Sequence, residues 1–194
     1  LGRLYSMNLP NKLTVIRILM IPVFLLLILP VGQGLLLPIP SQTGRILAAL
    51  VFVLAALTDL LDGAIARKQD CVTTFGKFLD PIADKLLVIS ALMALVQLGE
   101  ISAWPVIIII VREFIVQGVR IIAASEAVVI AASIWGKIKT FTQMVAIVLL
   151  ILMNYPISLF TSFPVAQVLL WISVVLTVSS GYDYLKANLD RLKN

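Results

Sequence analysis

The sequence predicts an all-α polytopic membrane protein with six transmembrane helices and a short N-terminal interfacial segment. Hydrophobic residues make up 61% of the 194 positions and charged residues only 13%, whereas soluble domains carry about 25% charged residues. Several apolar runs are about 20 residues long, the length that crosses a bilayer. The basic residues, which set the net charge of +5, fall between these runs. This distribution is typical of membrane topology and argues against a nucleic-acid-binding surface.

Polar, Pro-rich or Gly-rich turns separate the apolar runs and set the order of the elements. We expect the interfacial segment at residues 8–11, where Pro10 breaks a polar stretch, and a kink in the first helix at Pro22. We expect residues 7–194 to form one membrane domain. Residues 1–6 are expected to be an artificial extension and not a signal peptide. The least defined boundary falls at residues 123–136. The six helices are expected at about 13–29, 43–66, 76–98, 105–123, 137–153 and 165–185.

The distribution of positive charge predicts the orientation. Of the 15 Lys and Arg residues, only Arg45 falls on the side that we expect to face outward. Because cytoplasmic loops of membrane proteins are enriched in Lys and Arg, both termini are expected in the cytoplasm. The predicted location is the cytoplasmic membrane.

Four aspartates mark the candidate site. Asp59 and Asp62 stand three residues apart and Asp80 and Asp84 four apart, so each pair shares one helix face. A short loop between the two helices would bring both pairs to the cytoplasmic membrane surface. An Asp at the bilayer centre costs about 2.5 to 3.5 kcal/mol. Four such residues in so apolar a chain therefore indicate a functional site.

The residue types restrict the chemistry of this site. The chain has no His and a single Cys, Cys71, so a bound metal would have oxygen ligands, as Mg²⁺, Mn²⁺ and Ca²⁺ prefer. Two ions about 3.5 to 4 Å apart suit phosphoryl displacement, and the natural ligand is then a diphosphate. Small residues at Gly63, Ala66 and Gly76 leave room for a substrate, and Arg67 can meet a phosphate or nucleotide. Without His, an Asp beside the metals is the best available general base.

A second, cationic group suits a phosphorylated acceptor or an anionic lipid headgroup. Membrane topology by itself also predicts basic residues at this face, so Arg17 and Arg112, which lie within apolar helix sequence, are the stronger functional candidates. The members of the group are Arg112, Arg120, Lys137 and Lys139.

Two other interpretations of the aspartates remain open from the residues. The carboxylates could form structural ion pairs with Arg67, Lys77 and Lys85. They could also line the path of an ion transporter. Transporter sites, however, lie near the membrane midplane on interrupted helices, whereas these residues lie at helix ends.

The pattern resembles the signature of the CDP-alcohol phosphatidyltransferase family, and the resemblance extends over the chain from Met7. It implies that a CDP-linked lipid donates its phosphatidyl group to an alcohol and releases CMP, with two Mg²⁺ or Mn²⁺ ions on the diphosphate, in a homodimer. It further implies that all four aspartates hold metal, that Asp84 is also the catalytic base, and that the glycines, Ala66 and Arg67 contact the nucleotide. The matching residues are Asp59, Asp62, Gly63, Ala66 and Arg67, then, after eight residues, Gly76, Asp80 and Asp84.

A finer resemblance concerns the acceptor. Several residues are similar to those of the bacterial family members that use glycerol 3-phosphate, which implies that acceptor and phosphatidylglycerophosphate as the product. A cardiolipin synthase of the same family, which takes phosphatidylglycerol, is the alternative; inositol phosphate or serine is less favoured. The residues that carry this resemblance are Asn11, Thr14, Arg17, Arg112, Glu113, Arg120, Lys137, Lys139 and Thr140.

Overall fold

The computed structural model describes residues 9–29, 41–69, 74–125 and 134–188. Within these ranges, residues 9–11, 41, 59–69, 74–81, 124–125 and 187–188 are described by their backbone only. The described residues form helices joined by turns and short irregular stretches, and they contain no strand. The α-helices are α1 (Leu9–Ile28), α3 (Ser41–Gln69), α4 (Thr74–Gln97), α5 (Ala103–Ser125), α6 (Ile134–Ile151) and α7 (Val165–Asn188), with a short 3₁₀ helix, η1 (Ile157–Leu159), before α7.

Six α-helices are present where the sequence predicts them, with one correction at the N-terminus. From Leu9 onward the expected interfacial segment is not a separate element, because residues 9–11 form the start of α1. Pro10 is tolerated there since the first N–H groups of a helix have no intrahelical acceptor. The helix also continues through Pro22. Asn8 lies outside the described residues.

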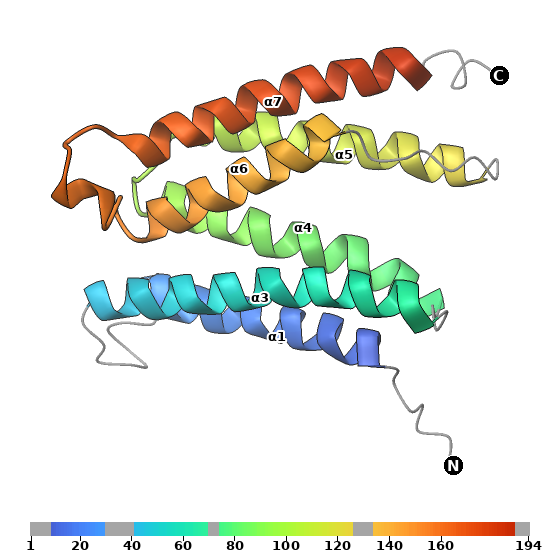
Figure 1. The fold of residues 1–194 in the computed structure, drawn as a ribbon, viewed down its shortest axis with the longest axis horizontal. Coiled ribbons are helices and arrows are strands. Elements are labelled where there is room, and N and C mark those ends of the chain that lie inside the picture. Colours follow the sequence, from blue (N-terminus) through green and yellow to red (C-terminus); the bar gives the residue numbers. More distant parts are fainter. Residues whose placement is uncertain (1–8, 30–40, 70–73, 126–133, 189–194) are drawn as a thin grey trace. The chain divides into compact units, whose positions relative to one another are not determined.

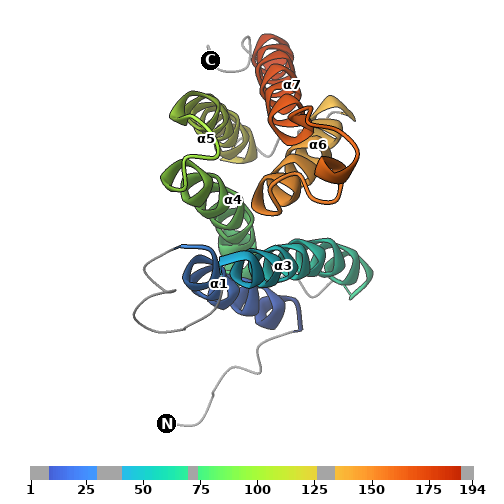
Figure 2. The ribbon, with the colours of Figure 1, turned by 90° about the vertical axis from the view of Figure 1, so that its left-hand side faces the viewer.

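The chain divides into two compact units, at Leu1–Leu98 and Gly99–Asn194. In the first unit, α1 packs against both α3 and α4 (Figures 1 and 2). The buried residues of α1 recur every three or four positions, so they form one stripe along the helix. Phe24 from this stripe meets Phe52 of α3 with ring centroids 6.0 Å apart. The stripe consists of Thr14, Arg17, Ile21, Phe24 and Ile28.

In the second unit, α7 packs against α5 and α6 (Figure 1). The turn that leads into α7 is held by Asn154, whose φ of 62° is a left-handed conformation that Asn tolerates well. Its Oδ1 accepts a hydrogen bond from the N–H of Ala166 at 2.7 Å, and its Nδ2 donates to Gln167 Oε1 at 3.2 Å. The side chain thus satisfies an N–H group in the first turn of α7.

Many large apolar side chains are exposed on these helices. On α5, for example, Val111 and Phe114 are exposed, as are Trp171 and Val175 on α7. A helix of a soluble bundle would present polar residues on its outer face. Among the described residues, Ile134–Ile151 and Val165–Lys186 are long and apolar enough to cross a membrane, and Gln42–Thr58 is a shorter apolar segment.

Candidate active site

The acidic positions lie on two consecutive helices of the first unit. Asp59 and Asp62 are near the C-terminal end of α3, and Asp80 and Asp84 are near the start of α4. Each pair lies within a continuous helix, where residues three or four apart are one turn apart. The two helices also contact each other. Residues 70–73, which connect them and include Cys71, lie outside the described residues.

Asp84 is the one predicted metal ligand whose side chain is described. It is half-buried, and it stands next to Ala83 and one turn before Leu87, both of which are buried. Among the described residues, no three His, Cys, Asp or Glu residues gather. The predicted metal site and nucleotide contacts otherwise fall on residues with no described side chain, and they stay predictions. These residues are Asp59, Asp62, Gly63, Ala66, Arg67, Gly76 and Asp80.

Helix α1 brings buried polar groups into the same unit. Thr14 is 0% and Arg17 1% exposed, and their spacing puts them on one face, in the stripe that packs within the unit. Arg is almost never fully buried in a protein unless it is paired. The side chain of Asn11, which the sequence places with these two, is not described.

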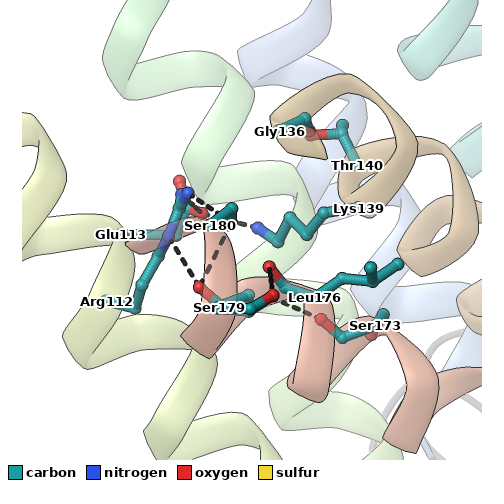
Figure 3. Close-up of polar contacts among 10 residues, drawn as sticks. Arg112, Glu113, Gly136, Lys139, Thr140, Ser173, Leu176, Ser179 and Ser180 are labelled. Atoms are coloured by element: carbon teal, nitrogen blue, oxygen red, sulfur yellow. Dashed lines mark hydrogen bonds and ion pairs between the residues drawn. The ribbon is translucent and has the colours of Figure 1, made fainter. Parts of the chain in front are cut away.

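The second unit contains a connected polar group that we name the Glu113 cluster: Arg112 and Glu113 on α5, Lys139 on α6 and Ser180 on α7 (Figure 3). One oxygen of Glu113, Oε1, accepts from Arg112 Nη1 at 3.0 Å and from Lys139 Nζ at 2.5 Å. Arg112 Nη2 donates to Ser180 Oγ at 2.9 Å. Side chains from three helices therefore meet around one guanidinium and one carboxylate.

The cluster is largely enclosed. Lys139 is 4% and Ser180 3% exposed. In this setting the charges of Arg112 and Lys139 exceed that of Glu113 by one, so the described members carry a net positive charge. Arg and Lys that are held in place in this way are suitable ligands for a phosphate group.

The structure brings only some of the predicted cationic residues together. Lys137 is exposed, and residues two apart on a helix do not share a face, so it points away from the direction of Lys139. Arg120 lies over the ring of Tyr184 on α7, with Cζ 5.7 Å from the ring centroid. The hydroxyl of Thr140 donates to the carbonyl of Gly136 in its own helix.

Residues of α7 are the part of the cluster that the sequence reasoning missed. The carbonyl oxygen of Thr177 accepts a hydrogen bond from Arg112 Nε at 3.2 Å. Ser180 Oγ accepts one from Arg112 Nη2. A usable signal was present in the sequence: Ser173, Thr177 and Ser180 recur at helical spacing in an otherwise apolar run. Small polar residues in this pattern mark faces where membrane helices pack closely.

The class of protein follows from the whole chain. The family model for CDP-alcohol phosphatidyltransferase matches residues 7–179, and the chain belongs to this family. The family that the aspartate pattern predicted is thereby confirmed, and the protein is an enzyme of the CDP-alcohol phosphatidyltransferase class.

Relatives within the family share most of their length with the chain. A Bacillus subtilis protein named CDP-diacylglycerol–glycerol-3-phosphate 3-phosphatidyltransferase is 47% identical over 193 residues, which cover 96% of this chain and 97% of the relative. A Rickettsia bellii protein of the same name is 43% identical, with 93% and 94% covered. A Mycobacterium tuberculosis protein named probable phosphatidylglycerophosphate synthase is 40% identical, with 94% and 82% covered.

Proposed function

We propose that this enzyme transfers the phosphatidyl group of CDP-diacylglycerol to sn-glycerol 3-phosphate, which gives phosphatidylglycerophosphate and CMP in phospholipid biosynthesis. The observation that carries the proposal is the name shared by relatives that are 47% and 43% identical over nearly the whole chain. The complete aspartate signature supports the donor half of the reaction. The Glu113 cluster, with its net positive charge, supports a phosphorylated acceptor.

The donor set at the aspartates fits a divalent cation that prefers oxygen. Carboxylates would be the ligands, and the chain has no His, so Mg²⁺ or Mn²⁺ is favoured over zinc or copper. Asp59, Asp62, Asp80 and Asp84 would hold two such ions, which would neutralise charge on the diphosphate when bound. We assign the contacts with the cytidine nucleotide to Gly63, Ala66, Arg67 and Gly76.

The chain's own residues have defined roles in this reaction. Asp84 takes the proton from a hydroxyl of glycerol 3-phosphate. The oxygen then attacks the lipid-side phosphorus of CDP-diacylglycerol, the bond from that phosphorus to the bridging diphosphate oxygen breaks, and CMP leaves with the electron pair. Arg112 and Lys139 bind the phosphate of the acceptor. From the sequence, Arg120 and Lys137 stay assigned to acceptor binding, and Asn11, Thr14 and Arg17 to a supporting role.

We place the enzyme in the cytoplasmic membrane as a multi-pass homodimer, with all six α-helices spanning and both termini in the cytoplasm. The exposed apolar side chains support a lipid environment for the helices, and two helices meet the length and composition of a span. Helices of 18 to 29 residues extend about 1.5 Å per residue, which is comparable with a hydrocarbon core of about 30 Å.

The test is CMP release from CDP-diacylglycerol by the detergent-purified protein with Mg²⁺. Glycerol 3-phosphate, phosphatidylglycerol, inositol 1-phosphate and serine are compared as acceptors. We expect release with glycerol 3-phosphate that EDTA abolishes. Release with phosphatidylglycerol alone would make the enzyme a cardiolipin synthase. No release with any acceptor from folded protein would refute the proposal and favour ion transport instead.

A further inference from the structure

Helix α7 holds the side chain of Arg112 in place through Thr177 and Ser180, and we call this set of contacts the Arg112 seat. The guanidinium donates from Nε to the carbonyl of Thr177 at 3.2 Å and from Nη2 to Ser180 Oγ at 2.9 Å. Thr177 and Ser180 are one turn apart, so both acceptors lie on the same side of α7. A third donor, Nη1, is directed to Glu113. A guanidinium has five N–H groups, and residues that the structure describes engage three of them.

Gly181 lies directly against the side chain of Arg112. A Cβ added at this position would lie 3.0 Å from Cγ and 3.3 Å from Nε of Arg112. Those atoms belong to the middle of the side chain, which is already held by its hydrogen bonds, so an Ala at position 181 would require Arg112 to move by a few tenths of an ångström against those bonds. Glycine costs about 1 kcal/mol relative to Ala within a helix. The contact with Arg112 gives a reason for a glycine at a place where helix propensity disfavours it.

The Arg112 seat determines where the remaining N–H groups of Arg112 lie relative to the ammonium group of Lys139. Arg112 Nη1 and Lys139 Nζ share Glu113 Oε1 as their acceptor, so the two nitrogens are no further apart than the sum of those two short distances. Within the described part of the chain, two N–H groups of Arg112 remain after its contacts with Thr177, Ser180 and Glu113. A fixed guanidinium loses less side-chain entropy on binding a ligand than a mobile one. An Arg that is displaced from α7 would lose this advantage.

We propose that Ser180 and Gly181 are positioning residues that set the guanidinium of Arg112 for the phosphate of the acceptor. The inference rests on the proposed function, because it assigns Arg112 to that phosphate. Neither residue needs to touch the substrate: Ser180 fixes one edge of the guanidinium, and Gly181 leaves the space for its stem. The seat thereby contributes to the choice of a phosphorylated acceptor.

The chain offers a matched control for each position. Gly118 is also a helical glycine, but a Cβ added to it would have nothing within 4 Å. Ser179 is exposed, and the one hydrogen bond of its hydroxyl among the described residues goes to the carbonyl of Leu176 in its own helix. The variants Gly181→Ala and Ser180→Ala are therefore compared with Gly118→Ala and Ser179→Ala.

We expect Gly181→Ala and Ser180→Ala to raise the KM for glycerol 3-phosphate about 3- to 10-fold, the effect of losing roughly one hydrogen bond. The kcat and the KM for CDP-diacylglycerol should stay within about twofold, since the reacting groups are intact. The two control variants should match the wild type. The same KM in Gly181→Ala and Gly118→Ala, with both proteins folded, would overturn the inference. A parallel loss of kcat and of both KM values would also overturn it, because that result indicates a general structural defect.

Binding of inorganic phosphate to the same detergent-purified variants, measured by calorimetry, separates this inference from the proposed function. We expect Gly181→Ala to weaken phosphate binding by a factor similar to the change in KM. If the wild type does not use glycerol 3-phosphate, the proposed function fails, but the phosphate titration still decides about the seat. Equal affinities of wild type and Gly181→Ala would then refute the positioning role.

Discussion

Lys139 donates to Glu113 Oε1 at 2.5 Å and in this way joins α6 to α5. The ammonium group belongs to a side chain with 5% exposure, and the carboxylate to one with 19%. Removing one partner of such an enclosed pair leaves the other charge without compensation, and this cost exceeds the net stabilisation by the intact pair.

Glu113→Ala is accordingly expected to destabilise the protein by about 3 kcal/mol and to raise the KM for glycerol 3-phosphate. Glu113→Gln, which keeps an oxygen acceptor of the same shape, should have a smaller effect on stability. Denaturation of the detergent-solubilised variants measures the first effect and CMP-release kinetics the second. Asp183→Ala, at an exposed position of α7, is the control. Equal stability of Glu113→Ala and Asp183→Ala would show that the ion pair is not structurally important.

The two lysines at the start of α6 are expected to differ. Lys139 is buried in the Glu113 cluster, whereas Lys137 is exposed. Lys139→Ala should raise the KM for glycerol 3-phosphate by about tenfold or more, the range for a hydrogen bond with a charged group, and Lys137→Ala by less than about threefold. Steady-state kinetics at varied acceptor concentration measure both. A larger effect from Lys137 would place the acceptor phosphate outside the Glu113 cluster.

Asp84→Asn tests the general base. The substitution keeps an oxygen ligand but removes the group that accepts the proton, so kcat should fall by about 100-fold or more. Binding of CDP-diacylglycerol, measured by equilibrium titration in the presence of Mg²⁺, should be retained. If Asp84→Asn turns over at the wild-type rate, Asp84 is not the base. If the lipid no longer binds, its main role is in holding the donor.

Removal of the divalent cation should abolish turnover reversibly. The proposed ligands are carboxylates, so Mg²⁺ or Mn²⁺ added after EDTA should restore CMP release and Zn²⁺ should not. Activity is measured after dialysis against each cation in turn. Full activity in the presence of excess EDTA would exclude the assignment of the four aspartates as ligands of an exchangeable metal.

The single cysteine tests the orientation of the chain. Cys71 comes between α3 and α4, and the proposed topology places this connection in the cytoplasm. A maleimide that cannot cross membranes should label Cys71 in inverted vesicles and not in intact cells. In a Cys71→Ser background, Phe160→Cys should show the opposite pattern, because Phe160 is 87% exposed in the turn between α6 and α7. Labelling of both positions from one side would refute the six-span topology.

Much of this enzyme could be predicted from local sequence. Apolar run length and turn residues were sufficient to predict the order of the helices. The reason is that any helix that spans a bilayer needs about 20 predominantly apolar residues. The spacing of Asp59, Asp62, Asp80 and Asp84 was sufficient for the family. Both kinds of information lie in the spacing of residues along the chain, and an α-helix converts that spacing directly into position on a face. The start of α1 was placed too late because a Pro in the first turn of a helix looks the same in sequence as a Pro that breaks one.

Tertiary structure decided which basic residues work together. In the sequence, Lys137 and Lys139 are equivalent members of one basic run, yet only Lys139 reaches Glu113. Equally, only the packing of α7 shows that Ser180 accepts a hydrogen bond from Arg112, which lies 68 positions away in the sequence. The same packing places Gly181 against the Arg112 side chain. These relationships depend on which helix faces meet across the bundle. That choice results from side-chain packing between distant segments, so the spacing of residues within any one helix does not contain it.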